Sequence, residues 1–105
     1  MSCSRNEVVL LPIPFTDLKS RKVRPAIVIG LSGADLFLVP ISSQLSNTDF
    51  VLKEWRAAGL NVACGVKAQI ATVAERLVVK TVGVLSAADR QILNDRLRNW
   101  LQLNS

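Results

Sequence analysis

Four cationic side chains stand close together near the start of the chain, with no acid between them. Lys19, Arg21, Lys22 and Arg24 fill four of six consecutive positions. Such a cluster attracts phosphate, and the guanidinium of an arginine presents a planar fork of donors that matches two phosphate oxygens. Pro25 biases the backbone of Arg24 towards an extended conformation, which constrains where its side chain points. The spacing therefore predicts a phosphate-binding loop that ends at Arg24.

Two other segments carry groups of similar chemistry. Ser42, Ser43 and Gln44 follow an apolar run, and residues 67–72 begin with a lysine and end with a threonine. A serine hydroxyl both donates and accepts hydrogen bonds. If the three segments converge, Arg24 and Ser42 would clamp a scissile RNA phosphate and stabilise its pentacovalent transition state. The ribose 2′-hydroxyl would then be the nucleophile, and no metal-bound water would be needed.

Phe15 and Thr16 lie just before the cationic cluster, where one could stack on a base and the other could hydrogen bond to it. Each candidate also has a plainer interpretation, because loop serines often form turns and lysines often extend from strands into water. Trp55 and Trp100 sit on apolar patterns and are assigned to a core or an interface. The residues predicted to bind RNA are Phe15, Thr16, Lys19, Arg21, Lys22, Ser43, Gln44, Lys67 and Thr72.

The composition argues against catalysis that depends on histidine or a metal ion. The chain has 105 residues and no histidine, so the usual general base and the commonest metal ligand are both missing. Its eight acids are dispersed, and Cys3 and Cys64 are too few for a metal motif or a disulfide framework. We therefore expect no metal or other cofactor, a reducing cytoplasmic setting, and Cys64 as a small buried apolar residue.

Length and charge indicate the class of protein. A chain of this size is expected to form a single domain over residues 1–105. The net charge of +5 favours a partner rich in phosphate or carboxylate, either a nucleic acid or an acidic polypeptide. The sequence contains no run of eighteen apolar residues, so it predicts no membrane-spanning helix. The N-terminus lacks the pattern of a signal peptide.

Short apolar segments separated by turn residues predict a β-rich fold. Ala26–Leu31 and Leu36–Pro40 have the pattern of two hairpin arms joined by a tight turn at residues 32–35. Lys53–Ala58 predicts one or two helical turns closed by Gly59 in a left-handed conformation. The other predicted strands are Val8–Pro12, Phe50–Leu52, Val62–Thr72 and Leu77–Thr81, with a polar loop at Ile41–Asn47.

The last segment predicts an amphipathic helix. Ser86 and Asp89 have the spacing of an N-terminal capping pair. Several short strands followed by one helix imply a mainly β, α+β domain, in which the helix packs on a small and strongly bent antiparallel sheet. The apolar residues that recur at helical spacing and form one stripe are Ile92, Leu93, Leu97, Trp100 and Leu101.

Landmarks of a known family occur in order along the chain. They are Glu7–Leu18 followed by Arg24–Val28, then Pro40–Gln44, Trp55–Leu60, Ile70–Thr72 and Gly83–Ser86. In this order and at this spacing they resemble the MazF/PemK family of toxin endoribonucleases, which belong to bacterial type II toxin–antitoxin pairs. The likeness extends over nearly the whole chain.

The resemblance implies an SH3-like barrel of antiparallel strands with a C-terminal helix, acting as a homodimer. It implies metal-independent, sequence-selective cleavage of single-stranded RNA that leaves a 2′,3′-cyclic phosphate and a 5′-hydroxyl. Arg24 matches the family's catalytic arginine, which stabilises the phosphorane and can protonate the leaving oxygen. Ser42 takes the place of the threonine that binds the scissile phosphate. An acidic antitoxin segment would occupy the RNA groove.

Three residues depart from the family's pattern. Ser42 keeps the hydroxyl of threonine but lacks the methyl group that restricts its rotamer. Ala68 and Ala71 stand where some relatives carry an acid and an arginine, and Lys67 could supply part of the missing positive charge. These departures bear on rate and sequence preference more than on fold.

Two other functions remain open at the level of sequence. One is a non-catalytic barrel of the same fold that poisons DNA gyrase, although the tail Leu101–Ser105 does not visibly match the C-terminal end on which that activity depends. The other is a decayed toxin that only binds its antitoxin. Cleavage of RNA by the purified protein separates the enzyme from both.

Overall fold

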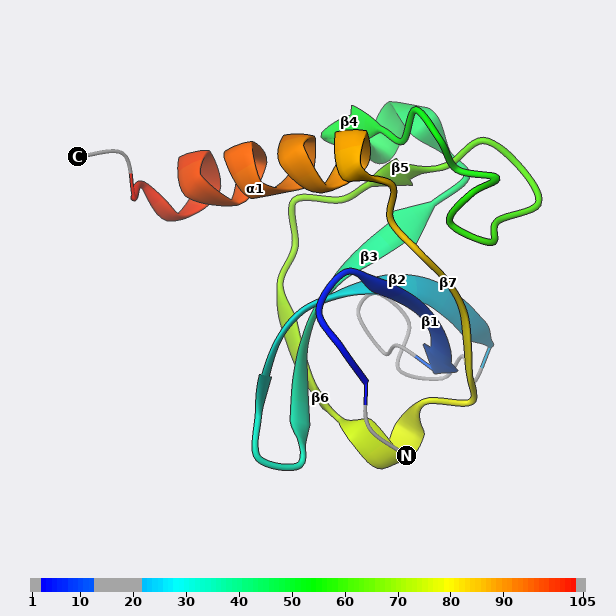
Figure 1. Ribbon diagram of the computed structural model, residues 1–105, viewed down its shortest axis with the longest axis vertical. Coiled ribbons are helices and arrows are strands. Elements are labelled where there is room, and N and C mark those ends of the chain that lie inside the picture. The colour runs from blue at the N-terminus through cyan, green and yellow to red at the C-terminus, as the bar shows by residue number, and fades with distance from the viewer. Residues whose placement is uncertain (1–2, 13–21, 104–105) are drawn as a thin grey trace.

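The computed structural model describes residues 3–12 and 22–103. Strands β1, β2, β3, β6 and β7 curve around a common centre, and β4, β5 and α1 form a layer at one end (Figure 1). The fold is therefore the mainly β, α+β barrel that the sequence predicts. The elements are β1 (Glu7–Pro12), β2 (Val23–Ser32), β3 (Asp35–Ser42), β4 (Phe50–Val51), β5 (Gly65–Val66), β6 (Ala71–Ala74), β7 (Lys80–Val84) and α1 (Ala87–Leu101), with 3₁₀ turns at Leu45–Asn47 and Glu75–Leu77.

Strand β3 lies at the centre of the topology. The strands follow the order β4-β5-β3-β2-β1-β7, and β6 pairs with β3 outside this path. The first half of β3, Asp35–Leu38, pairs with β6, whereas Ile41 and Ser42 pair with β5. Because β3 changes its partner between these two halves, the sheet must bend there. This bend is what turns a sheet of short strands into a barrel.

The hairpin of β2 and β3 confirms the predicted tight turn. Ser32 pairs with Asp35, so only Gly33 and Ala34 connect the strands. Gly33 has a φ of 60°, a left-handed conformation that glycine adopts without steric cost. Both strands extend beyond their predicted ends because β1 pairs with β2 as far as Val23 and β5 pairs with β3 as far as Ser42.

The central strands are buried on both faces, which explains their nearly continuous apolar sequences. Alternate side chains of a strand point to opposite faces. One set fills the inside of the barrel and the other packs beneath α1, so the sheet separates two cores. The inner core is Cys3, Val9, Leu11, Ala26, Val28, Leu36 and Leu38, and the core under α1 includes Val8, Ile27, Val39, Ile41, Phe50, Leu52, Leu85, Leu93 and Leu97.

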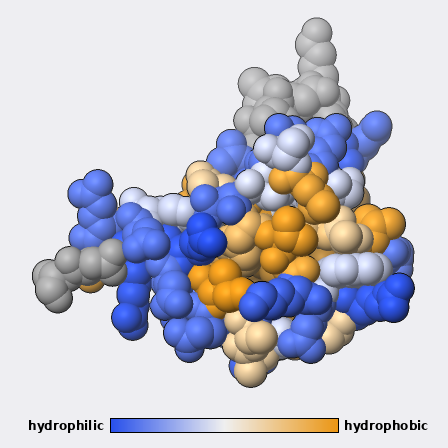
Figure 2. All heavy atoms as spheres, turned by 90° about the horizontal axis from the view of Figure 1, so that it is seen from above, coloured by the Kyte–Doolittle hydropathy of each residue, from blue (hydrophilic) through white to orange (hydrophobic). Residues whose placement is uncertain are grey.

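Helix α1 confirms the predicted cap and most of the predicted stripe. The backbone N–H of Asp89 donates to Ser86 Oγ at 3.2 Å. Ile92 and Trp100 are partly buried against the core, and so is Trp55, as expected for both tryptophans. Leu101 differs from the rest of the stripe, because it is 51% exposed and does not pack on the core of this chain. The last turn of α1 projects past the strands (Figure 1), and the surface on this side of the molecule is largely hydrophilic (Figure 2).

Residues 53–59 form consecutive turns, and Ala58 N–H donates to Glu54 C=O at 3.3 Å as in one turn of helix. Leu60 N–H donates to Trp55 C=O at 3.1 Å and Gly59 N–H donates to Arg56 C=O at 3.0 Å. This pair of bonds, with Gly59 at a φ of 87°, is the Schellman arrangement that ends a helix. The left-handed cap at Gly59 is thus confirmed, and the residues before it form one helical turn rather than two.

Two predicted strands have different bounds. Val62–Thr72 does not form one strand, because β5 pairs with the second half of β3 and β6 with the first half, and residues 67–70 must cross between them. The predicted strand Leu77–Thr81 is displaced to β7 by the 3₁₀ turn at Glu75–Leu77. Among the described residues, no helix has the length and apolar character needed to cross a membrane.

Candidate active site

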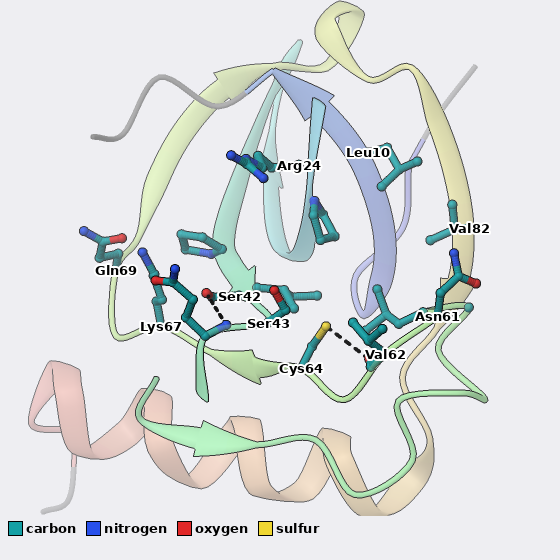
Figure 3. Close-up of a pocket in the computed structure, with 16 residues that line it drawn as sticks. Leu10, Arg24, Ser42, Ser43, Asn61, Val62, Cys64, Lys67, Gln69 and Val82 are labelled. Carbon is teal, nitrogen blue, oxygen red and sulfur yellow. Dashed lines mark hydrogen bonds between the residues drawn. The ribbon is translucent and has the colours of Figure 1, made fainter. Parts of the chain in front are cut away.

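A pocket of about 570 Å³ opens at the bend of the barrel. Its walls come from β1, β2, β3 and β7, from the chain around Cys64, and from the segment that follows the 53–59 turn (Figure 3). The three segments that the sequence predicts to converge do so here. Arg24, Ser42, Ser43, Gln44 and Lys67 all line this pocket.

The register of the sheet explains why Arg24 and Ser42 share the pocket. Pairing between β2 and β3 ends at Ala26 opposite Pro40. The same register, continued by two residues, sets Arg24 opposite Ser42, on the same face of the sheet. The strands part at this point because β3 turns towards β5. The pocket therefore lies between two strand ends that would otherwise pair.

Arg24 is held by its backbone and free at its side chain. Its backbone pairs with Leu11 of β1, and Pro25 pairs with Leu10. The guanidinium is exposed and has no hydrogen bond or ion pair within the described part of the chain. All its donors therefore remain available to an anionic ligand.

Ser42 is the last residue of β3, and its side chain is fixed locally. Its Oγ accepts a hydrogen bond from the backbone N–H of Gln44 at 3.0 Å (Figure 3). This bond restrains the rotamer of Ser42, as the methyl group of a threonine would. Since the bond uses a lone pair of the oxygen, the hydroxyl proton is left to donate into the pocket.

Lys67 provides a second cation on the other side of Ser42. Its backbone N–H donates to Pro40 C=O at 3.0 Å, which holds it beside the end of β3. Because β3 lies between β2 and β5, Arg24 and Lys67 flank Ser42. No carboxylate belongs to the pocket wall formed by the described residues. The site is therefore rich in donors and positive charge, which suits a phosphate group.

Other predicted residues lie elsewhere. Thr72 is exposed on β6, where it pairs with Phe37, and Lys22 is exposed just before β2. Neither lines the pocket, nor does Ala68 or Ala71. The assignment of Thr72 and Lys22 to RNA binding stays a prediction. Phe15, Thr16, Lys19 and Arg21 lie outside the described residues.

The pocket also contains residues that the sequence reasoning missed. Leu10, Asn61, Gln69 and Val82 line it alongside the predicted residues. For Leu10 and Val82 nothing in the local pattern separates a pocket wall from core. Asn61 did carry a signal, since a polar residue two positions after a glycine cap often stands on an exposed and functional loop.

Asp89 positions one wall of the pocket from a distance. Its side chain is fully buried, and its two carboxylate oxygens accept the backbone N–H groups of Lys53 and Glu54, both at 2.9 Å. The start of α1 is thereby tied to the start of the 53–59 turn. The sequence predicts Asp89 as a helix-capping residue, and this second role requires the tertiary structure.

Glycines fix the other end of that turn. A Cβ atom on Gly59 would collide with the carbonyl oxygen of Val82, and one on Gly83 would collide with that of Ala58. The turn thus lies directly on β7 with backbone against backbone. This contact places the residues after Gly59 at the mouth of the pocket.

Cys64 lines the pocket as an inert thiol. It is 4% exposed, and its Sγ donates to Val62 C=O at 3.3 Å. Burial raises the pKa of the Cys64 thiol above its ordinary value, so the reactive thiolate is disfavoured. The prediction of a small buried apolar residue is confirmed. Within the described ranges, no three His, Cys, Asp or Glu side chains are grouped so as to hold a metal ion.

Comparison with known proteins gives a likeness of fold. No family model matches the sequence, and no curated protein is significantly similar to it. Among solved structures, an endoribonuclease in complex with its cognate antitoxin from a mycobacterial species is similar, with a TM-score of 0.70 and 15% identity. The alignment covers 95% of this chain and 93% of that one. The shared fold agrees with the resemblance to the MazF/PemK toxins.

Proposed function

We propose that this protein is the toxin of a type II toxin–antitoxin pair, an endoribonuclease that cleaves single-stranded RNA without a metal ion. The observation that carries the proposal is the meeting of Arg24, Ser42 and Lys67 at one pocket. A guanidinium with no partner among the described residues, a fixed hydroxyl and an ammonium group there face a space with no acid in its described wall. The likeness of fold to an endoribonuclease supports the same activity.

The reaction proposed for this site is an internal transesterification. The ribose 2′-oxygen attacks phosphorus and loses its proton to solvent in the open pocket. The bond from phosphorus to the 5′ oxygen breaks, that oxygen takes up a proton, and the products are a 2′,3′-cyclic phosphate and a 5′-hydroxyl. Arg24 binds the non-bridging oxygens as their charge increases, and Ser42 donates a hydrogen bond to the same phosphate.

The remaining polar residues extend the proposed RNA contact. Ser43, Gln44 and Lys67 line the same pocket, so we assign them to the nucleotides around the scissile phosphate. We also propose that an acidic antitoxin competes for this surface and that two copies of the chain form the active toxin. The positive charge and the antitoxin in the structurally similar complex support the first of these proposals.

The test compares the native chain with Arg24→Ala on a long RNA in excess chelator. We expect the native chain to cut, and Arg24→Ala to lower kcat by about a hundred- to a thousandfold, the usual cost of one transition-state donor. Arg98→Ala is the matched control, because Arg98 is an exposed arginine of α1 outside the pocket. Mapping of 5′ ends that need phosphorylation before ligation identifies the 5′-hydroxyl product.

Three outcomes would contradict the proposal. Cleavage that stops when chelator is added would show that the reaction needs a metal ion. Equal cleavage by the native chain and Arg24→Ala would remove the arginine from the mechanism. Intact RNA in every sample, with binding of an acidic peptide retained, would indicate a decayed toxin.

A further inference from the structure

The pocket is divided into two chemically different halves. Arg24, Ser42 and Lys67 stand on one side, and Leu10 and Val82 stand on the other (Figure 3). The second side is aliphatic, with Leu60 and Val62 completing it. A nucleotide has the same division, because its phosphate is charged and the faces of its base are apolar. One nucleotide can therefore satisfy both halves at once.

Asn61 is an exposed polar side chain at the rim of the apolar half. It lies beside Val82 at the mouth of the pocket (Figure 3). Its carboxamide has no hydrogen-bond partner within the described part of the chain. A carboxamide offers one acceptor and two donors, and it can pair with a base edge that presents a neighbouring donor and acceptor.

The turn that leads to Asn61 is held at both of its ends, and a recognition residue needs such support. The preceding turn ends in the Schellman bonds from Gly59 and Leu60, and it rests on β7 without room for a Cβ atom at Gly59. At its other end the carboxylate of Asp89 binds the turn. The turn that carries Asn61 is therefore fixed, although Asn61 itself lies in a loop.

We propose that the apolar half of the pocket is a base-recognition subsite and that Asn61 reads the edge of one RNA base next to the scissile phosphate. Leu10 and Val82 contact the face of the base while the carboxamide pairs with its edge. This inference rests on the proposed function, because the phosphate held by the cationic half fixes which base reaches Asn61. It assigns sequence preference to one residue.

The experiment maps cleavage sites in an RNA of randomised sequence. The native chain is compared with Asn61→Asp, which replaces the donors of the carboxamide by an acceptor, and with Asn61→Leu, which removes both. We expect the preference for one base at a single position to fall by about ten- to a hundredfold in both variants, the usual discrimination of a two-bond contact. Asn94→Asp adds the same charge on α1, outside the pocket, and should leave the preference unchanged.

A second arm separates failure of this inference from failure of the proposed activity. Short RNAs carrying a 2′-deoxy sugar at the mapped site, or four homopolymers if no cleavage occurs, are titrated with each variant by fluorescence anisotropy. Base-dependent affinity that is lost in Asn61→Asp and kept in Asn94→Asp supports the subsite even without cleavage. Unchanged base preference in both Asn61 variants overturns it, as does a native chain that cuts or binds every sequence equally.

Discussion

Replacement of Asp89 should release the 53–59 turn, which supports one wall of the pocket, and lower the stability of the fold. Its carboxylate is completely buried and receives two backbone N–H groups, from Lys53 and Glu54, at 2.9 Å each. Asp89→Ala removes both acceptors at once. The turn that carries Gly59, and with it Asn61, then loses its attachment to α1.

The size of the effect follows from these two bonds. A hydrogen bond to a charged acceptor contributes about 1.5 to 3 kcal/mol, so the pair sets a range of about 3 to 6 kcal/mol. Lys53 and Glu54 are exposed, so water can reach their N–H groups in the variant and recover part of this energy. We therefore expect Asp89→Ala to lower the free energy of unfolding by about 3 kcal/mol. Asp89→Asn retains one carbonyl acceptor, so it should lose about half as much.

Urea unfolding followed by tryptophan fluorescence measures this loss, since Trp55 lies within the turn itself. In a chain of this size a loss of about 3 kcal/mol corresponds to a fall in Tm of about 12 °C. Asp95→Ala is the control, because Asp95 is an exposed residue of the same helix and, among the described residues, accepts only from Gln91 Nε2 at 3.4 Å. It should stay within about 0.5 kcal/mol of the native chain. Equal stabilities of Asp89→Ala and Asp95→Ala would refute the reasoning.

Two further predictions concern the cationic half of the pocket. Ser42→Ala should lower kcat by about a hundredfold because it removes a donor to the phosphate. Ser42→Thr should cleave at least as fast as the native chain. Slower cleavage by this variant would show that the bond from Gln44 N–H does not restrain the Ser42 rotamer in place of the missing methyl group. Lys67→Ala should weaken binding of uncleavable RNA and reduce the slope of log Kd against log salt by about 0.7, the value for one phosphate contact on a single strand. Lys53→Ala, an exposed lysine outside the pocket, should keep the native slope, and an unchanged slope in Lys67→Ala would remove Lys67 from the RNA contact.

Local signals were sufficient for the features that depend on neighbouring residues. The turn at Gly33, the cap at Gly59 and the start of α1 at Ser86 each depend on the conformation or side chain of one residue, and all three predictions are confirmed. Val62–Thr72 failed as a single strand because its division is decided by β3, which pairs with β6 in its first half and β5 in its second. No pattern within residues 62–72 indicates where β5 ends and β6 begins.

The same contrast applies to the site. Arg24 and Ser42 could be singled out because a proline and a polar segment mark them, yet their meeting depends on the register of β2 and β3. Asp89 was predicted only as a cap, because its second role arises from contacts over a long separation in sequence. The bond between Asp89 and Lys53, for example, joins residues 36 positions apart.

The bend in β3 explains why the fold and the proposed chemistry depend on each other. If β2 and β3 continued to pair beyond Ala26 and Pro40, the end of the strand that carries Ser42 would lie in a closed ladder beside Arg24. Since β3 turns to β5 instead, the two strand ends part and a pocket opens between side chains that still share one face. The guanidinium and the hydroxyl then line one pocket without either being enclosed, and Lys67 joins them from the position directly after β5. A mutation that straightened β3 would therefore damage the site even if it left Arg24, Ser42 and Lys67 in place.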